Sequence, residues 1–190
     1  MAKTKKSKAK RIKPEDVYVN AVSFRAASMA LSLPQPNPVD KIILFWPSVV
    51  CEAFALELFI KCLHHIRRRT KVRGHDVEAL FGILSKNDKR KVVKYYQEIV
   101  QLHPEYQMAL KHGIRFDVDS VLLRAKESFI KLRYWHEHNP PSADSSGHIS
   151  NAGVGSLCDA LHRLIDEARP DWPGMALDIP VLLGNLPPPT

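Results

Sequence analysis

Residues 47–66 read PSVVCEAFALELFIKCLHHI, and apolar side chains occupy nearly every face of a helix built from this stretch. A helix that is apolar almost all the way round belongs in the middle of a bundle, where other helices cover each of its faces. Pro47 suits a first helical position, because the N–H that proline lacks has no partner there anyway. We therefore expect a central helix that begins at Pro47 and ends near Ile66.

Further helices are predicted on both sides of this one, with proline or glycine in most of the gaps. The expected segments are 14–33, 76–84, 87–102, 104–113, 117–138 and 154–168. The run from Val39 to Trp46 is apolar but isolated, so we interpret it as a buried loop or short helix rather than a strand. The fold class that follows is all-α, an up-and-down helical bundle of about five to six helices.

Two details of these helices can be predicted from residue type. Asn87 and Asp88 are good N-cap residues for the helix that follows them, and Asp117 is one for the next long helix. Along that long helix, apolar residues recur at steps of three and four, which predicts a core-facing stripe. Its members are Val118, Leu122, Ala125, Phe129, Leu132 and His136.

The length of 190 residues favours one domain with two tails. We place a disordered basic tail at 1–13, the helical domain at 14–169 and a proline-rich C-terminal tail at 170–190. Seven of the eight net positive charges lie in the basic tail, which leaves +1 for the rest of the chain. A flexible basic tail attracts phosphate without reading sequence, so it is either an electrostatic arm for RNA or a solubilising end.

No apolar run resembles a membrane span, and the lysine-rich start lacks the hydrophobic stretch of a secretory signal. We expect a cytoplasmic protein with no membrane contact. Three cysteines without C-x-x-C spacing, Cys51, Cys62 and Cys158, are interpreted as reduced core thiols. No histidine or cysteine spacing predicts a metal site, and no motif predicts a cofactor.

Charged side chains interrupt the apolar pattern at three places, namely Glu57 with Lys61, Arg133 with Glu137, and His75 with Asp76. The first two are pairs four residues apart, which share one helical face. Burying an isolated charge costs several kcal/mol, so these groups are expected to satisfy one another in a shared network or to face a wet cleft. The alternative is that they are ordinary exposed pairs on a helix surface.

Three motifs surround these charges, FALELFIK at 54–61, GHDVEALF at 74–81 and FIKLRYWHEH at 129–138. Together they resemble the HEPN-like bacterial proteins, in which an E-x-x-x-K helix, a G-H-D helix start and a late R-Y helix pack into one bundle. The resemblance covers roughly residues 15–168 and adds Tyr134 to the expected network. It implies RNA as a partner, a homodimer, a defence or toxin-antitoxin setting, and an antitoxin or nucleotidyltransferase as a further partner.

Many HEPN domains are metal-independent ribonucleases with an arginine followed four to six residues later by a histidine. Arg133 and His138 fit that spacing. The resemblance therefore implies that His138 acts as general base or acid on a ribose 2′-hydroxyl or a leaving oxygen, while Arg133 stabilises charge on the phosphate.

A basic stretch between two predicted helices would hold an RNA backbone if the cleft lies nearby, and is otherwise an exposed loop. It consists of Arg67, Arg68, Arg69, Lys71 and Arg73. Two further readings of the whole chain stay open beside the ribonuclease. One is a non-catalytic interaction or small-ligand-binding module whose buried polar network is structural. The other is an adaptor brought to nucleic acid by its lysine tail.

Overall fold

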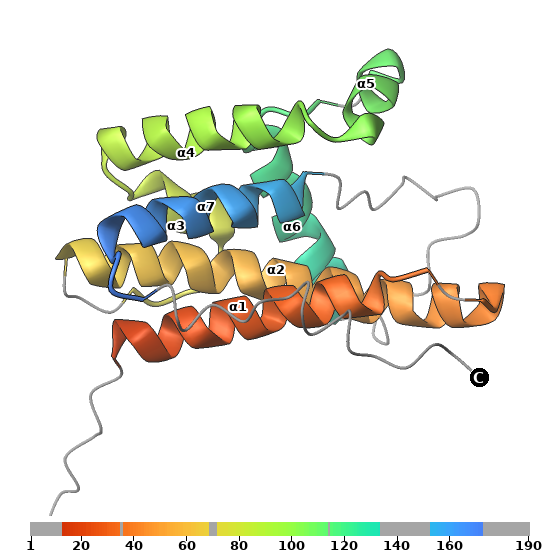
Figure 1. The fold of residues 1–190 in the computed structure, drawn as a ribbon, viewed down its shortest axis with the longest axis horizontal. Coiled ribbons are helices and arrows are strands. Elements are labelled where there is room, and N and C mark those ends of the chain that lie inside the picture. Colours follow the sequence, from red (N-terminus) through yellow and green to blue (C-terminus); the bar gives the residue numbers. More distant parts are fainter. Residues whose placement is uncertain (1–12, 35, 69–71, 114, 134–152, 173–190) are drawn as a thin grey trace, which may run out of the picture.

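The computed structural model describes residues 13–34, 36–68, 72–113, 115–133 and 153–172. Within these ranges the chain forms seven α-helices and no β-strand. The helices are α1 (Pro14–Leu31), α2 (Pro38–Arg68), α3 (Val77–Gly82), α4 (Lys86–Val100), α5 (Pro104–Lys111), α6 (Val118–Arg133) and α7 (Val154–Ala168). The prediction of an all-α helical bundle is confirmed. Figure 1 shows α1, α2, α7 and α4 as successive layers, with α3 and α6 behind them.

Helix α2 is the central element of the bundle. It packs against α1 and α7 on either side, and against α3 and α6 as well (Figure 1). Such a helix needs apolar side chains on several faces, which explains its composition. Its fully buried apolar residues are Val49, Ala53, Ala55, Leu56, Phe59, Ile60, Cys62 and Leu63.

Helix α2 begins at Pro38 and not at Pro47, so the prediction of its start is wrong. Pro47 lies inside the helix and removes the N–H that would bond to the carbonyl of Ile43. Ile43 is 60% exposed, so water can reach this side of the helix and replace the missing partner. The prediction of a buried loop or short helix for 39–46 is therefore corrected to an extension of α2 whose Ile43 and Phe45 are exposed.

The helix caps agree in part with the prediction from residue type. Helix α4 is capped by Ser85, whose Oγ accepts from the Asp88 N–H at 3.0 Å. Asn87 and Asp88 lie inside the first turn of α4, and the Asp88 carboxylate accepts from the Ser85 hydroxyl at 2.7 Å. The prediction that they are the caps is therefore wrong. Asp117 does act at the start of α6, because its Oδ1 accepts from the Ser120 N–H at 2.8 Å.

The core-facing stripe of α6 is confirmed for its first three members, Val118, Leu122 and Ala125, which are all buried. The side chains of Phe129 and Leu132, and the whole of His136, lie outside the described residues. Helix α7 begins and ends where the sequence predicts, and its buried residues alternate at steps of three and four.

One stretch in the described part of the chain, Ile43–Arg68, is long and apolar enough to cross a membrane by length and composition alone. From the sequence we expected no apolar run of this length, and that expectation is corrected here. The rest of the bundle buries 44% of the most apolar window of this stretch.

The three cysteines are free thiols, with Cys62 and Cys158 buried and Cys51 half-buried. Burial raises the pKa of the Cys62 thiol to about 12, so this group stays protonated at neutral pH. These features agree with the interpretation of reduced core cysteines.

Gly153, which immediately precedes α7, is a position where alanine should be costly. Its φ is +89°, and an added Cβ would lie 2.6 Å from the Tyr96 hydroxyl and 3.0 Å from Val121. Tyr96 is fully buried and cannot move aside cheaply. We expect Gly153→Ala to lower the free energy of unfolding by about 2 kcal/mol in urea denaturation.

The matched control is Gly113→Ala, because Gly113 also has a positive φ, +71°, but open space where a Cβ would go. It isolates backbone strain, which costs about 1 kcal/mol. Equal losses for Gly113→Ala and Gly153→Ala would contradict the close packing against Tyr96.

Candidate functional site

A buried carboxylate on α2 joins two of the motifs noted in the sequence. Glu57 is only 4% exposed. Its Oε1 accepts from the Lys61 ammonium at 2.6 Å, one turn further along α2. His75, from the segment before α3, places Nδ1 3.1 Å from both carboxylate oxygens. The structure thus brings Glu57, Lys61 and His75 together around one buried negative charge.

The geometry of His75 leaves one ring nitrogen for an external group. An ionised carboxylate can only accept hydrogen bonds, so the contact with Glu57 places a proton on Nδ1. In the neutral ring, Nε2 is then an acceptor, and the His75 side chain is 60% exposed. A surface imidazole oriented by a buried carboxylate has the arrangement needed for proton transfer.

Asp76 belongs to a neighbouring cluster and not to the carboxylate of Glu57. Its Oδ1 caps α3 by accepting from the N–H groups of Glu78 and Ala79, both at 3.1 Å. Its Oδ2 lies 2.9 Å from the ammonium of Lys126 on α6, which also contacts Glu78 at 2.7 Å. The hydrogen bond from Lys126, with that from the Ala79 N–H, lowers the pKa of Asp76. These pairs fasten α6 to the start of α3.

The end of α6 carries the remaining motif. Arg133 is the last residue of α6, seven positions beyond Lys126. The side chain of Arg133 lies outside the described part of the structure, as do Tyr134, Glu137 and His138 in full. The catalytic pair implied by the resemblance, and the contribution of Tyr134 and Glu137 to the network, therefore stay predictions.

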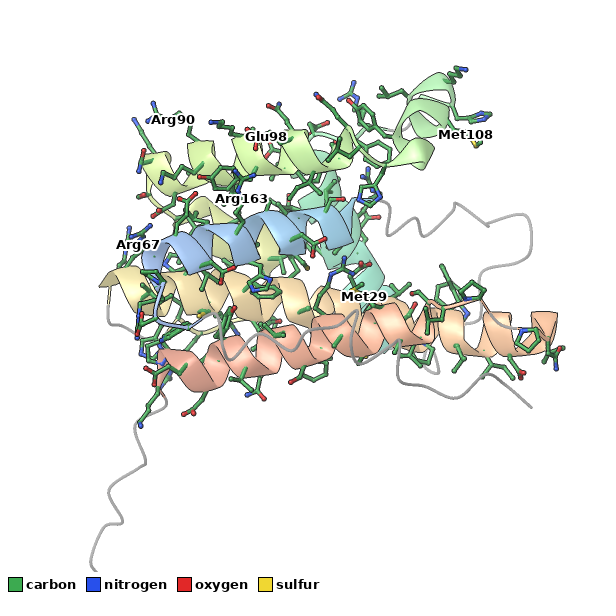
Figure 2. All side chains as sticks on the ribbon, viewed as in Figure 1. Met29, Arg67, Arg90, Glu98, Met108 and Arg163 are labelled. Atoms are coloured by element: carbon green, nitrogen blue, oxygen red, sulfur yellow. The ribbon has the colours of Figure 1, made fainter. Side chains whose placement is uncertain are left out.

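The residues of the basic stretch after α2 differ in whether their charges are paired. Arg67, labelled at the end of α2 in Figure 2, places Nη2 3.1 Å from the buried Asp88 carboxylate, so its charge is paired. Arg68 and Arg73 are exposed, and neither has an ion pair with any described residue. Arg69 and Lys71 lie outside the described residues. Within this basic stretch, Arg68 and Arg73 are therefore the described side chains that are available to a phosphate.

A second charged cluster, which the sequence reasoning missed, joins α1, α2 and α7. Arg25 makes two parallel bonds to Asp159, from Nε and Nη2 at 3.1 Å each. Its Nη1 donates to Glu52 at 3.1 Å. Burial alone would lower the pKa of the guanidinium, but the hydrogen bond and charge of Asp159 outweigh it and raise the pKa. Arg25 is therefore a fixed cation at a three-helix junction.

A signal for this cluster was present in the sequence. Arg25 is a charged residue among the apolar residues Ala21, Val22, Ala26 and Ala27. Glu57 was selected as a candidate on the same kind of pattern. Its partner on α7 lies 134 residues away, and no local periodicity relates such positions.

A third polar group lies where α1 meets α7. The Tyr18 hydroxyl is 2.6 Å from Nε2 of His162 and donates to Asp166 at 3.0 Å. Tyr18 is fully buried, and burial is the main cause that raises its pKa. His162 also stacks on Phe59 of α2, with ring centroids 5.5 Å apart. These bonds hold α1 and α7 in register against the core.

No protein-family model, no curated protein and no solved structure matches the chain. In the parts of the chain that the structure describes, no group of three or more histidine, cysteine, aspartate or glutamate side chains is arranged to hold a metal ion.

Proposed function

We propose that this chain is an HEPN-like domain that binds RNA and cleaves it without a metal ion, acting as a cytoplasmic homodimer in a defence or toxin-antitoxin setting. The observation that carries the proposal is the convergence of the motif-bearing elements. His75 reaches Glu57 across 18 residues, and Lys126 reaches Glu78 across 48 residues. The E-x-x-x-K helix, the G-H-D helix start and the helix that ends at Arg133 are therefore neighbours.

The charges around this junction suit a phosphodiester substrate. Glu57 is saturated by two partners and buried, so it adds little repulsion at the surface. The exposed guanidinium groups of Arg68 and Arg73 offer charge-assisted hydrogen bonds to phosphate oxygens. The His75 ring is exposed at the surface, next to α2 and before α3. RNA contacts of this kind are electrostatic, so binding should weaken steeply with added salt.

The proposed reaction uses Arg133 and His138. His138 takes the proton from a ribose 2′-hydroxyl, and the 2′-oxygen attacks the adjacent phosphorus as the bond to the 5′-oxygen breaks. The leaving 5′-oxygen is protonated by a histidine in the acid form or by water. Arg133 stabilises the charge that develops on the phosphate oxygens. The products are a 2′,3′-cyclic phosphate and a free 5′-hydroxyl.

The test is cleavage of a fluorescently labelled single-stranded RNA by the full chain at low salt in the presence of EDTA. We expect cyclic-phosphate products, and we expect Arg133→Ala and His138→Ala each to lower the rate by about a hundredfold. Arg90→Ala and His112→Ala are the matched controls, because both residues are exposed and lie outside the three motifs. Both controls should cleave at the rate of the unchanged protein.

Intact RNA after long incubation with folded protein would refute the enzymatic proposal. Unchanged rates in Arg133→Ala and His138→Ala would refute the assigned pair, even if the RNA is cut. Thermal melting of each variant separates loss of activity from loss of fold.

The alternative function is a non-catalytic binding module. It is favoured by the pairing of each charge in the network with an opposite charge. Each charge of Glu57, Lys61, Asp76 and Lys126 has an opposite charge within 3.1 Å, as expected of a network that serves packing. On this reading RNA stays intact, and His138→Ala leaves both binding and the melting temperature unchanged.

A further inference from the structure

An apolar stripe runs along one side of α1, away from the HEPN-like motifs. Its members follow one another at steps of three and four, so they lie above one another on the helix. The middle of the stripe is buried or half-buried, whereas Val19 and Leu33 at its ends are 41% and 36% exposed. Such a surface suits a further apolar segment packed on it. The stripe consists of Val19, Val22, Ala26, Met29 (labelled in Figure 2) and, in the turn after α1, Leu33.

The described part of the chain ends beside the start of this stripe. Trp172, the last described residue, is 1% exposed and belongs to the core. The Arg169 guanidinium covers the Trp172 ring and places Nη2 3.5 Å from Oε1 of Glu15. Glu15 stands four residues before Val19, so it lies on the same side of α1 one turn earlier. Residues 173–190 therefore begin where the stripe begins.

The sequence of residues 173–190 is PGMALDIPVLLGNLPPPT. Large apolar side chains occupy every second position from 175 to 183, which is the period of an extended chain and not of a helix. Pro180 also opposes a helix, because it supplies no N–H and disfavours the helical conformation for the residue before it. An extended segment of this pattern has one edge that is wholly apolar, formed by Met175, Leu177, Ile179, Val181 and Leu183. The opposite edge carries Ala176, Asp178, Pro180 and Leu182.

The two apolar surfaces are similar in length. From Val19 to Leu33 a helix advances about 21 Å, at about 1.5 Å per residue. From Met175 to Leu183 an extended chain advances about 26 Å, at about 3.3 Å per residue. The segment is also attached next to the stripe through Trp172, which gives it a high effective concentration there that a separate partner lacks. The occupant that fits the stripe best is therefore this chain's own C-terminal segment.

We infer that residues 175–183 pack along α1 as an extended strap, with their apolar edge on the stripe from Val19 to Leu33. The strap runs in the direction of α1, from Trp172 toward the turn before α2. It covers the apolar stripe and leaves Asp178 on the edge that faces water. The folded domain then continues beyond residue 169, where the sequence analysis ends it, to about residue 183.

The test is photo-crosslinking of the full chain with p-benzoylphenylalanine in place of Val19. Irradiation and peptide mass spectrometry should show position 19 joined to residues 173–190 of the same chain. Leu102 is the control position, because it is 83% exposed and follows α4, which α2 and α7 separate from α1 (Figure 1). The same group at position 102 should give no crosslink to residues 173–190.

Substitutions on the two edges of the segment give a second arm of the experiment. The double variant Ile179→Asp with Val181→Asp places two charges on the apolar edge, so the crosslink yield from position 19 should fall at least about tenfold. Ala176→Asp with Leu182→Asp is the matched control, because it places the same two charges on the opposite edge and should retain the yield. Circular dichroism checks that the helices stay folded in every variant.

Crosslinks within one chain that are lost in the first double variant and kept in the second support the strap. A product with the mass of two chains would overturn it, because the segment would then pack on another copy. Absence of any crosslink from position 19 to residues 173–190, or equal yields in the two double variants, would also overturn it. None of these results depends on whether the protein cleaves RNA.

Discussion

Replacement of Trp172 by alanine is expected to lower the free energy of unfolding by about 4 kcal/mol, the largest loss that we predict for a single residue. Trp172 follows α7 and is 1% exposed. Its ring lies 5.2 Å from that of Tyr18, and the Arg169 guanidinium covers it at 4.1 Å from the ring centroid. Alanine would leave a cavity between the end of α7 and the start of α1, in the middle of these contacts.

Urea denaturation followed by circular dichroism measures this loss. Trp172→Phe keeps an aromatic ring beside Tyr18 and should lose clearly less than Trp172→Ala. Leu102→Ala is the surface control, because Leu102 is 83% exposed and its loss should stay within about 0.5 kcal/mol. A loss below about 1 kcal/mol for Trp172→Ala would show that this ring is not part of the core.

Removal of the buried carboxylate in Glu57→Ala is expected to lower the free energy of unfolding by about 3 kcal/mol. The variant leaves Lys61 and His75 without their common acceptor. Lys61 is the main source of the cost, because its side chain is only 18% exposed. The His75 side chain is 60% exposed and can turn to water, which places the loss at the low end for a broken buried pair.

The control is Glu78→Ala, which breaks an ion pair to Lys126 whose carboxylate is 40% exposed. Such surface pairs contribute about 1 kcal/mol or less. A double-mutant cycle of Glu57→Ala with Lys61→Ala isolates the coupling between the two charges. Equal losses for Glu57→Ala and Glu78→Ala would mean that the Glu57 network carries no special weight in stability.

The sequence by itself determined the helices and their short-range contacts. Periodicity and cap residues located α3, α7 and the start of α6 closely, because each of these signals acts within a few residues. The Glu57 and Lys61 pair was predictable for the same reason, since residues four apart on a helix share a face. The start of α2 was missed because proline is a weak stop when the exposed side of a helix can bond to water.

Only the tertiary structure decided which distant side chains meet. The sequence analysis grouped His75 and Asp76 with Glu57 because all three interrupt an apolar pattern. The fold brings His75 to Glu57 but turns Asp76 toward Lys126. The junction of Arg25 with Asp159 had a local signal at Arg25 alone, because its partner lies 134 residues further along the chain. Such residues meet because of the angle and the distance at which their helices pack. The angle and the distance depend on how many side chains fit together, which no local pattern records.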